Sequence, residues 1–332
     1  MPEPPATVTV AAMSVRLTVE RAAWIEHVHG TAAAYGHGLV PVVKGNGYGF
    51  GRSALHEAVH SAGARHVCVG TIHELHDVPE PLVPVVLTPT LAAPTSTRPV
   101  LTVGSLAHVD ALHGWHGRVM VKVAGSMHRY GIEPALVHEL VDACAAAALQ
   151  VEGFAVHLPL AGDDASRLAE IDTLVAPLPA RAPVWVSHLT PDSFHTLQER
   201  HPDRPWSVRV GTALWHGVPR GSFLRLTAEV LDVRPIRQGD VAGYRHTPAA
   251  ATGWLVAVGA GSAAGVAPLD SDDPTRRSPF HFAQQRLTLL EAPHMHTSLV
   301  VVPEGQPCPA VGDRVDVQRP LTTTFVDEVV WT

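Results

Sequence analysis

The sequence predicts an α/β fold, with an N-terminal (β/α)8 barrel of the TIM type followed by a smaller C-terminal all-β domain. Short apolar runs alternate with helix-length amphipathic runs over about 200 residues, which is typical of parallel βα units. Polar residues follow several of the apolar runs, which favours a closed barrel over an open sheet. Beyond residue 221 the pattern changes to short β-rich runs. We therefore assign residues 14–222 to the barrel and residues 223–332 to the β domain, with a possible contribution from residues 1–13.

The individual elements follow from the same patterns. An alternating run at 15–19 predicts a strand, and apolar residues at helical spacing predict a helix that ends near residue 35. Runs of β-branched residues predict further barrel strands at 41–43, 66–70, 83–88, 100–103, 119–123, 151–157, 184–187 and 208–210. Helices are predicted at 53–62, 134–149, 166–174 and 191–200, and a helical turn is predicted at 71–77. Strands of the β domain are predicted at 224–233, 254–258, 286–290, 298–302 and 314–317.

Composition excludes several classes of protein. The chain has 332 residues, 46% hydrophobic and 17% charged, which indicates a folded core rather than disorder. Its net charge of −7 and the lack of a basic cluster argue against nucleic-acid binding. Three widely separated cysteines give neither a disulfide framework nor zinc spacing, so no metal site is predicted. With no signal peptide pattern and no run of eighteen apolar residues, we expect a cytoplasmic protein that does not enter the membrane.

The stretch from Val42 to Gly51 is the first candidate for chemistry. Lys44 stands where an apolar strand ends, and four glycines follow it within seven residues, so the backbone can approach a ligand closely. A partly buried lysine can lose its proton and attack an aldehyde. The alternative interpretation of the pattern is a solvated charge at a turn.

This stretch resembles the lysine motif V-V-K-A-N-A-Y-G-H-G of the alanine racemase family, whose enzymes use pyridoxal 5′-phosphate. Glycine stands at both alanine positions of the motif, and Phe50 stands at its histidine. The resemblance implies that Lys44 forms the Schiff base with the cofactor and acts as acid and base on one face of the substrate. It also implies that Tyr48 lies in the cofactor pocket near the phosphate.

Cationic and histidine side chains stand at the ends of later predicted strands. They are Lys122, Arg129, His157, His188 and Arg209. A lone histidine at such a place is more often a structural residue. In one barrel, however, the five would meet at the same rim and suit a ring that carries a phosphate.

The segment around Lys122 resembles the family's K-x-D-T-G-M-x-R-x-G pattern. The resemblance implies that Arg129 lies beside the phenolic oxygen of the cofactor. Lys122 matches a lysine that many members carry as a carbamate, which orients that arginine. The segment Gly153–Leu158 is similar to the family's G-x-x-T-H-F, which implies that His157 packs against the pyridine ring.

Two further segments resemble parts of the family's cofactor site. His188 stands where the family has a serine that helps to hold the phosphate. Residues 208–217 are similar to V-R-P-G-I-x-L-Y-G, which implies Arg209 as the partner of the pyridine nitrogen, and Gly211 and Thr212 as phosphate contacts. Because an arginine stays protonated, the ring nitrogen opposite it is expected to stay unprotonated.

The resemblance continues into the β-rich part, with two substitutions. Ser262 stands where the family has its catalytic tyrosine, which works on the second face of the substrate from the other subunit of a dimer. Met295 and His296 replace the family's Met-Asp pair near the substrate carboxylate. A serine without an adjacent base is a weak acid or base, and loss of a positioned acid or base costs about 10²–10⁴-fold in rate.

Three functions remain open from the sequence. The resemblance implies a homodimeric amino-acid racemase with shared active sites, which binds pyridoxal 5′-phosphate and interconverts L-alanine and D-alanine. The serine at position 262 leaves two alternatives, an enzyme of the same fold with different chemistry and a protein that binds the cofactor without catalysis.

Overall fold

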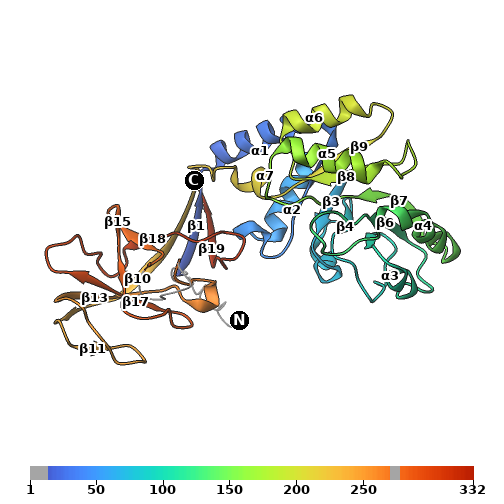
Figure 1. Ribbon diagram of the computed structural model, residues 1–332. Helices are drawn as coiled ribbons and strands as arrows, with labels where there is room; N and C mark the ends of the chain where they lie inside the picture. Colours follow the sequence, from blue (N-terminus) through green and yellow to red (C-terminus); the bar gives the residue numbers. More distant parts are fainter. Residues whose placement is uncertain (1–13, 270–276) are drawn as a thin grey trace, which may run out of the picture. The chain divides into compact units, whose positions relative to one another are not determined.

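The computed structural model describes residues 14–269 and 277–332. Their contacts divide the chain into two compact units (Figure 1). One unit, called the barrel unit, comprises Ile25–Arg220. The other, called the β unit, comprises Gly221–Thr332 and the described residues before Ile25. Residues 1–13, for which a contribution to the β domain is predicted, lie outside the described residues.

A parallel sheet forms the centre of the barrel unit. Its strands follow one another in the order β2-β9-β8-β7-β6-β5-β4-β3. The two ends of this order meet, because Val42 and Cys68 form a parallel bridge in which the Val43 amide donates to the Cys68 carbonyl at 2.8 Å. The sheet is therefore a closed barrel, as predicted. The strands are β2 (Leu39–Pro41), β3 (His66–Val69), β4 (Val83–Val86), β5 (Val100–Val103), β6 (Arg118–Lys122), β7 (Gln150–Ala155), β8 (Val184–Ser187) and β9 (Trp206–Val210).

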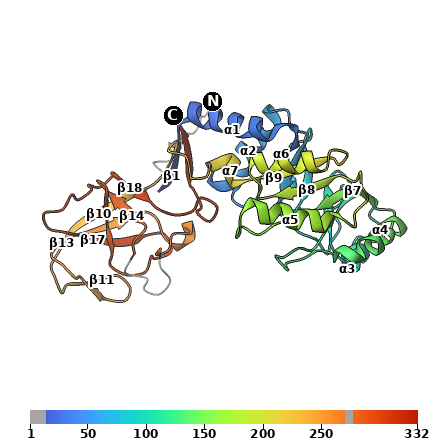
Figure 2. The same cartoon turned by 45° about the horizontal axis from the view of Figure 1, so that its top comes forward.

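Helices cover the outside of this sheet (Figures 1 and 2). Between β3 and β4 the helix is replaced by the 3₁₀ segment η3 (Ile72–Asp77), and the helix predicted at 134–149 divides into η4 (Pro134–Leu136) and α4. The helices are α1 (Arg21–Tyr35), α2 (Arg52–Ser61), α3 (Leu106–Asp110), α4 (Val137–Ala146), α5 (Asp164–Val175), α6 (Pro191–Arg200) and α7 (Thr212–His216). The remaining 3₁₀ segments are η1 (Gly36–Gly38), η2 (Gly47–Gly49) and, in the β unit, η5 (Ser262–Ala264).

The interior of the barrel is filled with side chains. A buried cluster takes residues from seven of the eight strands or their immediate continuations, among them Val42, Cys68, Met120 and Trp185. A barrel of this kind has a solid core, so functional residues collect at the rim formed by the carboxyl ends of the strands.

The β unit is built on one long strand, β10 (Leu224–Ile236). It pairs antiparallel with β1 (Val15–Val19), β13 (Gly253–Val258) and β18 (Arg314–Val317). The other strands are β11 (Val241–Ala242), β12 (Thr247–Pro248), β14 (Phe280–Phe282), β15 (Gln285–Arg286), β16 (Thr288–Leu289), β17 (Ser298–Pro303) and β19 (Glu328–Trp331). This confirms the predicted all-β part. Because β1 pairs with β10 and β19, these residues belong to the β unit, whereas the boundary at residue 14 grouped them with the barrel.

In the described ranges, no helix is both long and apolar enough to cross a membrane.

Candidate active site

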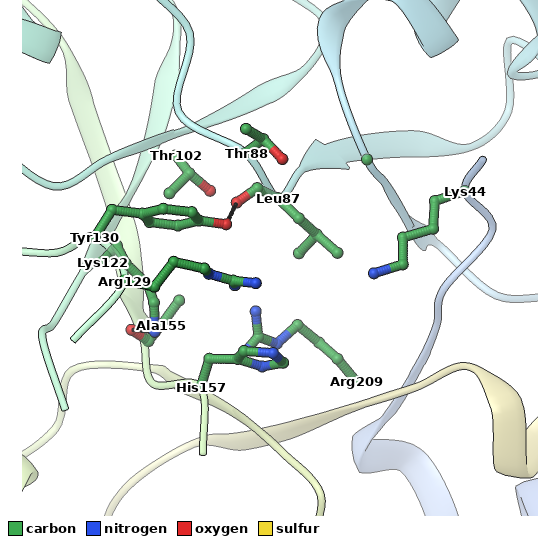
Figure 3. Close-up of a pocket in the computed structure, with 11 residues that line it drawn as sticks. Lys44, Leu87, Thr88, Thr102, Lys122, Arg129, Tyr130, Ala155, His157 and Arg209 are labelled. Carbon is green, nitrogen blue, oxygen red and sulfur yellow. Dashed lines mark hydrogen bonds between the residues drawn. The ribbon is translucent and has the colours of Figure 1, made fainter. Parts of the chain in front are cut away.

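A cavity of about 90 Å³ lies at the carboxyl ends of the barrel strands (Figure 3). Five of the predicted site residues line it, and they come from the ends of four strands: Lys44, Lys122, Arg129, His157 and Arg209. Figure 3 shows the amine of Lys44 pointing into the cavity, towards the guanidinium groups of Arg129 and Arg209. The barrel therefore brings together residues that are up to 165 positions apart in the chain.

Lysine is used sparingly in this chain. The sequence has 22 arginines but only two lysines, Lys44 and Lys122. Both line the same cavity. An arginine supplies a permanent positive charge but no amine that can lose its proton and react. The cavity therefore contains both lysine amines of the chain.

Lys44 is an exposed residue at the rim of the cavity, and its amine points into the cavity (Figure 3). The chain turns sharply after it, where the Gly47 amide donates to the Lys44 carbonyl at 3.0 Å. Partial burial and the positive charges of Arg129 and Arg209 lower the pKa of its ammonium below the usual value. A larger fraction of the amine is thus free of its proton near neutral pH than in an ordinary surface lysine.

Lys122 forms part of the floor of the cavity. It is buried, with 5% of its surface exposed, and its amine donates to the Ala155 carbonyl at 3.3 Å. Burial, together with the charges of Arg209 and Arg129, lowers the pKa of Lys122 to about 6. The amine is therefore mainly uncharged at pH 7.

Arg209 is held by the main chain of the neighbouring strands. Its Nε donates to the Val186 carbonyl at 3.3 Å, and its Nη2 donates to the Val156 carbonyl. Burial lowers its pKa, but arginine starts from so high a value that the group keeps its charge near neutral pH. These two anchors fix where the remaining donors of the guanidinium lie in the cavity.

His157 is uncharged in this environment. Burial and the charge of Arg209 lower its pKa to about 2. Its Nδ1 lies 2.6 Å from the Ser187 hydroxyl, which fixes the plane of the ring. The result is a neutral, oriented aromatic ring at the edge of the cavity.

Arg129 reaches the cavity from the loop after β6. Its guanidinium lies 4.5 Å from the centre of the Tyr130 ring, and the Tyr130 hydroxyl donates to the Leu87 carbonyl at 3.2 Å (Figure 3). Tyr130 therefore supports one face of the arginine.

The four residues predicted to hold a phosphate, Tyr48, His188, Gly211 and Thr212, are not part of the cavity lining. Two of them meet directly, because a Cβ atom added to Gly211 would lie 2.2 Å from the Tyr48 hydroxyl. Thr212 is the first residue of α7, whose His216 Nε2 lies 2.8 Å from the Tyr48 carbonyl.

His188 stands beside the cavity rather than in it. It has a φ of 60°, and the centre of its ring lies 4.9 Å from that of His157. Burial and the charge of Arg209 lower its pKa to about 4, so the ring is neutral at pH 7. His188 thus packs against the ring of His157, which lines the cavity.

The three predicted residues of the β unit lie together. The Ser262 amide donates to the His294 carbonyl at 2.8 Å, and the Ala263 amide donates to the Met295 carbonyl at 2.9 Å. Ser262, Met295 and His296 all have exposed side chains. Next to them, the buried Glu291 accepts a hydrogen bond from Nε2 of His294 at 2.5 Å.

Some residues of the cavity were missed in the sequence. Thr88, Thr102 and Tyr130 line it, and Glu74 supports the chain at Lys44. Thr88, Thr102 and Glu74 follow or lie within predicted elements, but no motif distinguishes them. Tyr130 is adjacent to Arg129, and its place in the cavity could have been inferred from that neighbour.

The comparisons with known proteins agree with this fold. Residues 21–219 match the family model described as the N-terminal domain of alanine racemase. A curated alanine racemase from Mycolicibacterium vanbaalenii is 31% identical over 268 residues, which are 69% of this chain. The chain spans 66% of that relative's length.

Solved structures show the same architecture. The alanine racemase from Bartonella henselae, which carries covalently bound pyridoxal phosphate, superimposes with a TM-score of 0.73 at 19% identity, over 97% of this chain and all of that one. The alanine racemase from Streptomyces lavendulae gives a TM-score of 0.72 at 20% identity, over 97% of each chain. At these identities the likeness concerns the fold. The family model covers more than half of the chain, so the chain belongs to the alanine racemase family.

Proposed function

We propose that this protein is a pyridoxal-phosphate-dependent amino-acid racemase, and that alanine is its substrate. The observation that carries the proposal is the placement of both lysines of the chain in one cationic cavity at the barrel rim. Family membership and the fold shared with the Bartonella henselae enzyme support the same cofactor.

The charges of the cavity fit an anionic occupant. Among the described residues, those that line it include two lysines and two arginines but no aspartate or glutamate. Unpaired buried cations are unfavourable, which is why Lys122 loses its charge. A ligand with a phosphate and a phenolic oxygen would supply the missing negative charge.

Each residue then has a defined task. Lys44 would attach the aldehyde and move a proton to and from Cα of the amino acid on one face. Arg209 would donate to the ring nitrogen, Arg129 to the phenolic oxygen, and the neutral His157 ring would pack against the pyridine ring. When bound, pyridoxal phosphate supplies an electron-withdrawing ring conjugated with the amino acid.

The phosphate is assigned to Tyr48, His188, Gly211 and Thr212. The close approach of Gly211 to the Tyr48 hydroxyl joins two of these residues. A dianionic phosphate beside His188 would favour the protonated ring, which could then donate a charge-assisted hydrogen bond.

The acid/base group on the second face of the substrate distinguishes two candidate functions. Racemisation needs a proton acceptor on each face of Cα, and Ser262 stands at the position of the family's tyrosine. The proposed racemase therefore uses Ser262 or a neighbour, with Met295 and His296 at the substrate carboxylate. The alternative is a pyridoxal-phosphate protein with altered chemistry or a binding role, which the same serine favours.

The test is to incubate the purified, cofactor-loaded protein with L-alanine or D-alanine and to separate the enantiomers by chiral chromatography. We expect both reactions to approach the same mixture. Lys44→Arg keeps the charge but removes the reactive amine, and should lower the rate by at least about a hundredfold. Spectral changes with amino acids but no racemisation would favour altered chemistry, and tight cofactor binding without turnover would favour a binding role.

We also propose that the protein forms a homodimer, as the family resemblance implies. Sedimentation at about twice the chain mass of 35.3 kDa is expected, and a monomer at micromolar concentration would contradict it.

A further inference from the structure

The barrel closes between β2 and β3, which are the two ends of its strand order. Between β2 and β3 the ladder consists of the bridge between Val42 and Cys68. Just beyond this bridge, the two strands are linked through a side chain: Glu74 of η3 accepts hydrogen bonds from two main-chain amides. Its Oε1 lies 3.0 Å from the Gly45 amide nitrogen, and its Oε2 lies 2.7 Å from that of Gly70.

The other side of Gly45 is held as well. Its carbonyl accepts a hydrogen bond from Nη1 of Arg52 at 2.7 Å. Arg52 is fixed in turn, since its Nε donates to Asp77 at 2.7 Å. The amide and the carbonyl of Gly45 are thus bound by side chains from η3 and α2.

These contacts determine the orientation of Lys44. The Gly45 amide belongs to the same peptide plane as the Lys44 carbonyl, which accepts from the Gly47 amide at 3.0 Å. This plane is therefore held at both ends. Since it fixes the backbone at Lys44, it fixes the direction from which the side chain enters the cavity (Figure 3).

The loop needs such support because all four of its glycines have positive φ values, among them the two on either side of Asn46. Gly45 has a φ of 60° and Gly47 a φ of 64°. Glycine has more freedom in the unfolded loop than any other residue, so the peptide orders only if it is held from outside. Gly70 has a matching role, because a Cβ atom there would lie 3.1 Å from each carboxylate oxygen of Glu74.

We propose that Glu74 is a positioning residue for the reaction at Lys44: with Arg52, its carboxylate fixes the Lys44–Gly45 peptide so that the amine is presented to an aldehyde in the cavity. This inference rests on the proposed function. It assigns a positioning role to a residue that is not part of the cavity lining. The competing role is that of a structural link between β2 and β3.

The experiment measures covalent attachment at Lys44 separately from non-covalent binding in the cavity. Two ligands share the ring and the phosphate, but only pyridoxal 5′-phosphate has an aldehyde, whereas pyridoxine 5′-phosphate has an alcohol in its place. Covalent attachment at Lys44 is measured by borohydride reduction and peptide mass spectrometry, and binding of the alcohol by calorimetry. The variants are Glu74→Ala and Glu74→Gln, and the control is Glu57→Gln, on the exposed face of α2.

Glu74→Ala should slow attachment at Lys44 by about tenfold to a hundredfold, since small misplacements of a reacting group have effects of that size. Binding of pyridoxine 5′-phosphate should stay within about twofold of the wild type. Glu74→Gln keeps the shape and one acceptor, so it should show a smaller loss of attachment and retain the fold if the alanine variant does not. Glu57→Gln should behave as the wild type in both assays.

Two results would overturn the inference alone. One is attachment in both Glu74 variants at the wild-type rate, and the other is an equal loss of attachment and of pyridoxine 5′-phosphate binding, which marks a structural link. If the wild type itself attaches no aldehyde at Lys44, the proposed function and this inference fail together.

Discussion

Lys122 has an environment that opposes its charge. It is 5% exposed, and its pKa falls to about 6 because of burial and the neighbouring Arg209 and Arg129. In the unfolded chain a lysine titrates near 10.4. Between pH 6 and about 10 the unfolded state therefore binds more protons than the folded state, and the stability of the folded state rises with pH through this window.

Lys122→Met removes this dependence. Between pH 6 and 9, the free energy of unfolding of the wild type should rise relative to that of the variant by up to about 1.4 kcal/mol per pH unit. Below pH 6 the difference between the two proteins should level off. Urea denaturation at several pH values, with both proteins free of cofactor, measures it. A difference that does not change with pH would contradict an uncharged Lys122 in the folded protein.

Single residues at strand ends were predictable from the sequence. Lys44, Lys122 and Arg209 were named because the carboxyl ends of parallel strands converge, and the structure brings them to one cavity. Glu74 was not predictable, because its hydrogen bonds to Gly45 and Gly70 join a side chain to distant main-chain amides without any periodic pattern.

At the scale of elements, the turn into α7 packs closely against the segment η2, through Gly211 and Tyr48. A Cβ atom at Gly211 would lie 2.2 Å from the hydroxyl and 2.9 Å from Cζ of Tyr48. The two elements also meet at His216 of α7, whose Nε2 lies 2.8 Å from the Tyr48 carbonyl oxygen. Little room is left for either element to move.

Gly211→Ala should therefore destabilise the protein by about 1–3 kcal/mol, a typical effect of overpacking. The same substitution in a Tyr48→Phe background should be less destabilising, because the atom nearest to the new methyl group is gone. Thermal unfolding of the four proteins of this double-mutant cycle measures the coupling. Equal losses in both backgrounds would show that the contact with the hydroxyl is unimportant.

Whether a segment is a helix or a strand could mostly be predicted from the sequence, but which strands pair with each other could not. The strand at 15–19 was predicted correctly as β1 and grouped with the barrel, although it pairs with β10 and β19. Alternation of apolar residues shows that a strand buries one face, but it does not show which strand lies beside it. The length of β10 was also underestimated, because its last residues, through Ile236, are mostly exposed.

At the scale of the whole molecule, charge is distributed unevenly. The chain has a net charge of −7, yet the cavity at the barrel rim is lined by the basic side chains of Lys44, Arg129 and Arg209 and by no aspartate or glutamate among the described residues. Binding of an anionic cofactor would balance this local excess of positive charge and so explains its presence in an acidic protein. The barrel and the β-rich part were both predicted from the change of pattern near residue 221, but the grouping of the first strand needed the structure.

In the proposed function, the amine of Lys44 binds the aldehyde of pyridoxal phosphate. Because the chain has only two lysines, one measurement decides it. The protein is incubated with pyridoxal 5′-phosphate, reduced with borohydride and digested, and the modified peptide is identified by mass spectrometry. We predict one modification per chain, on Lys44. An unmodified Lys44, whether the label is absent or found on Lys122 or the N-terminal amine, would contradict the account.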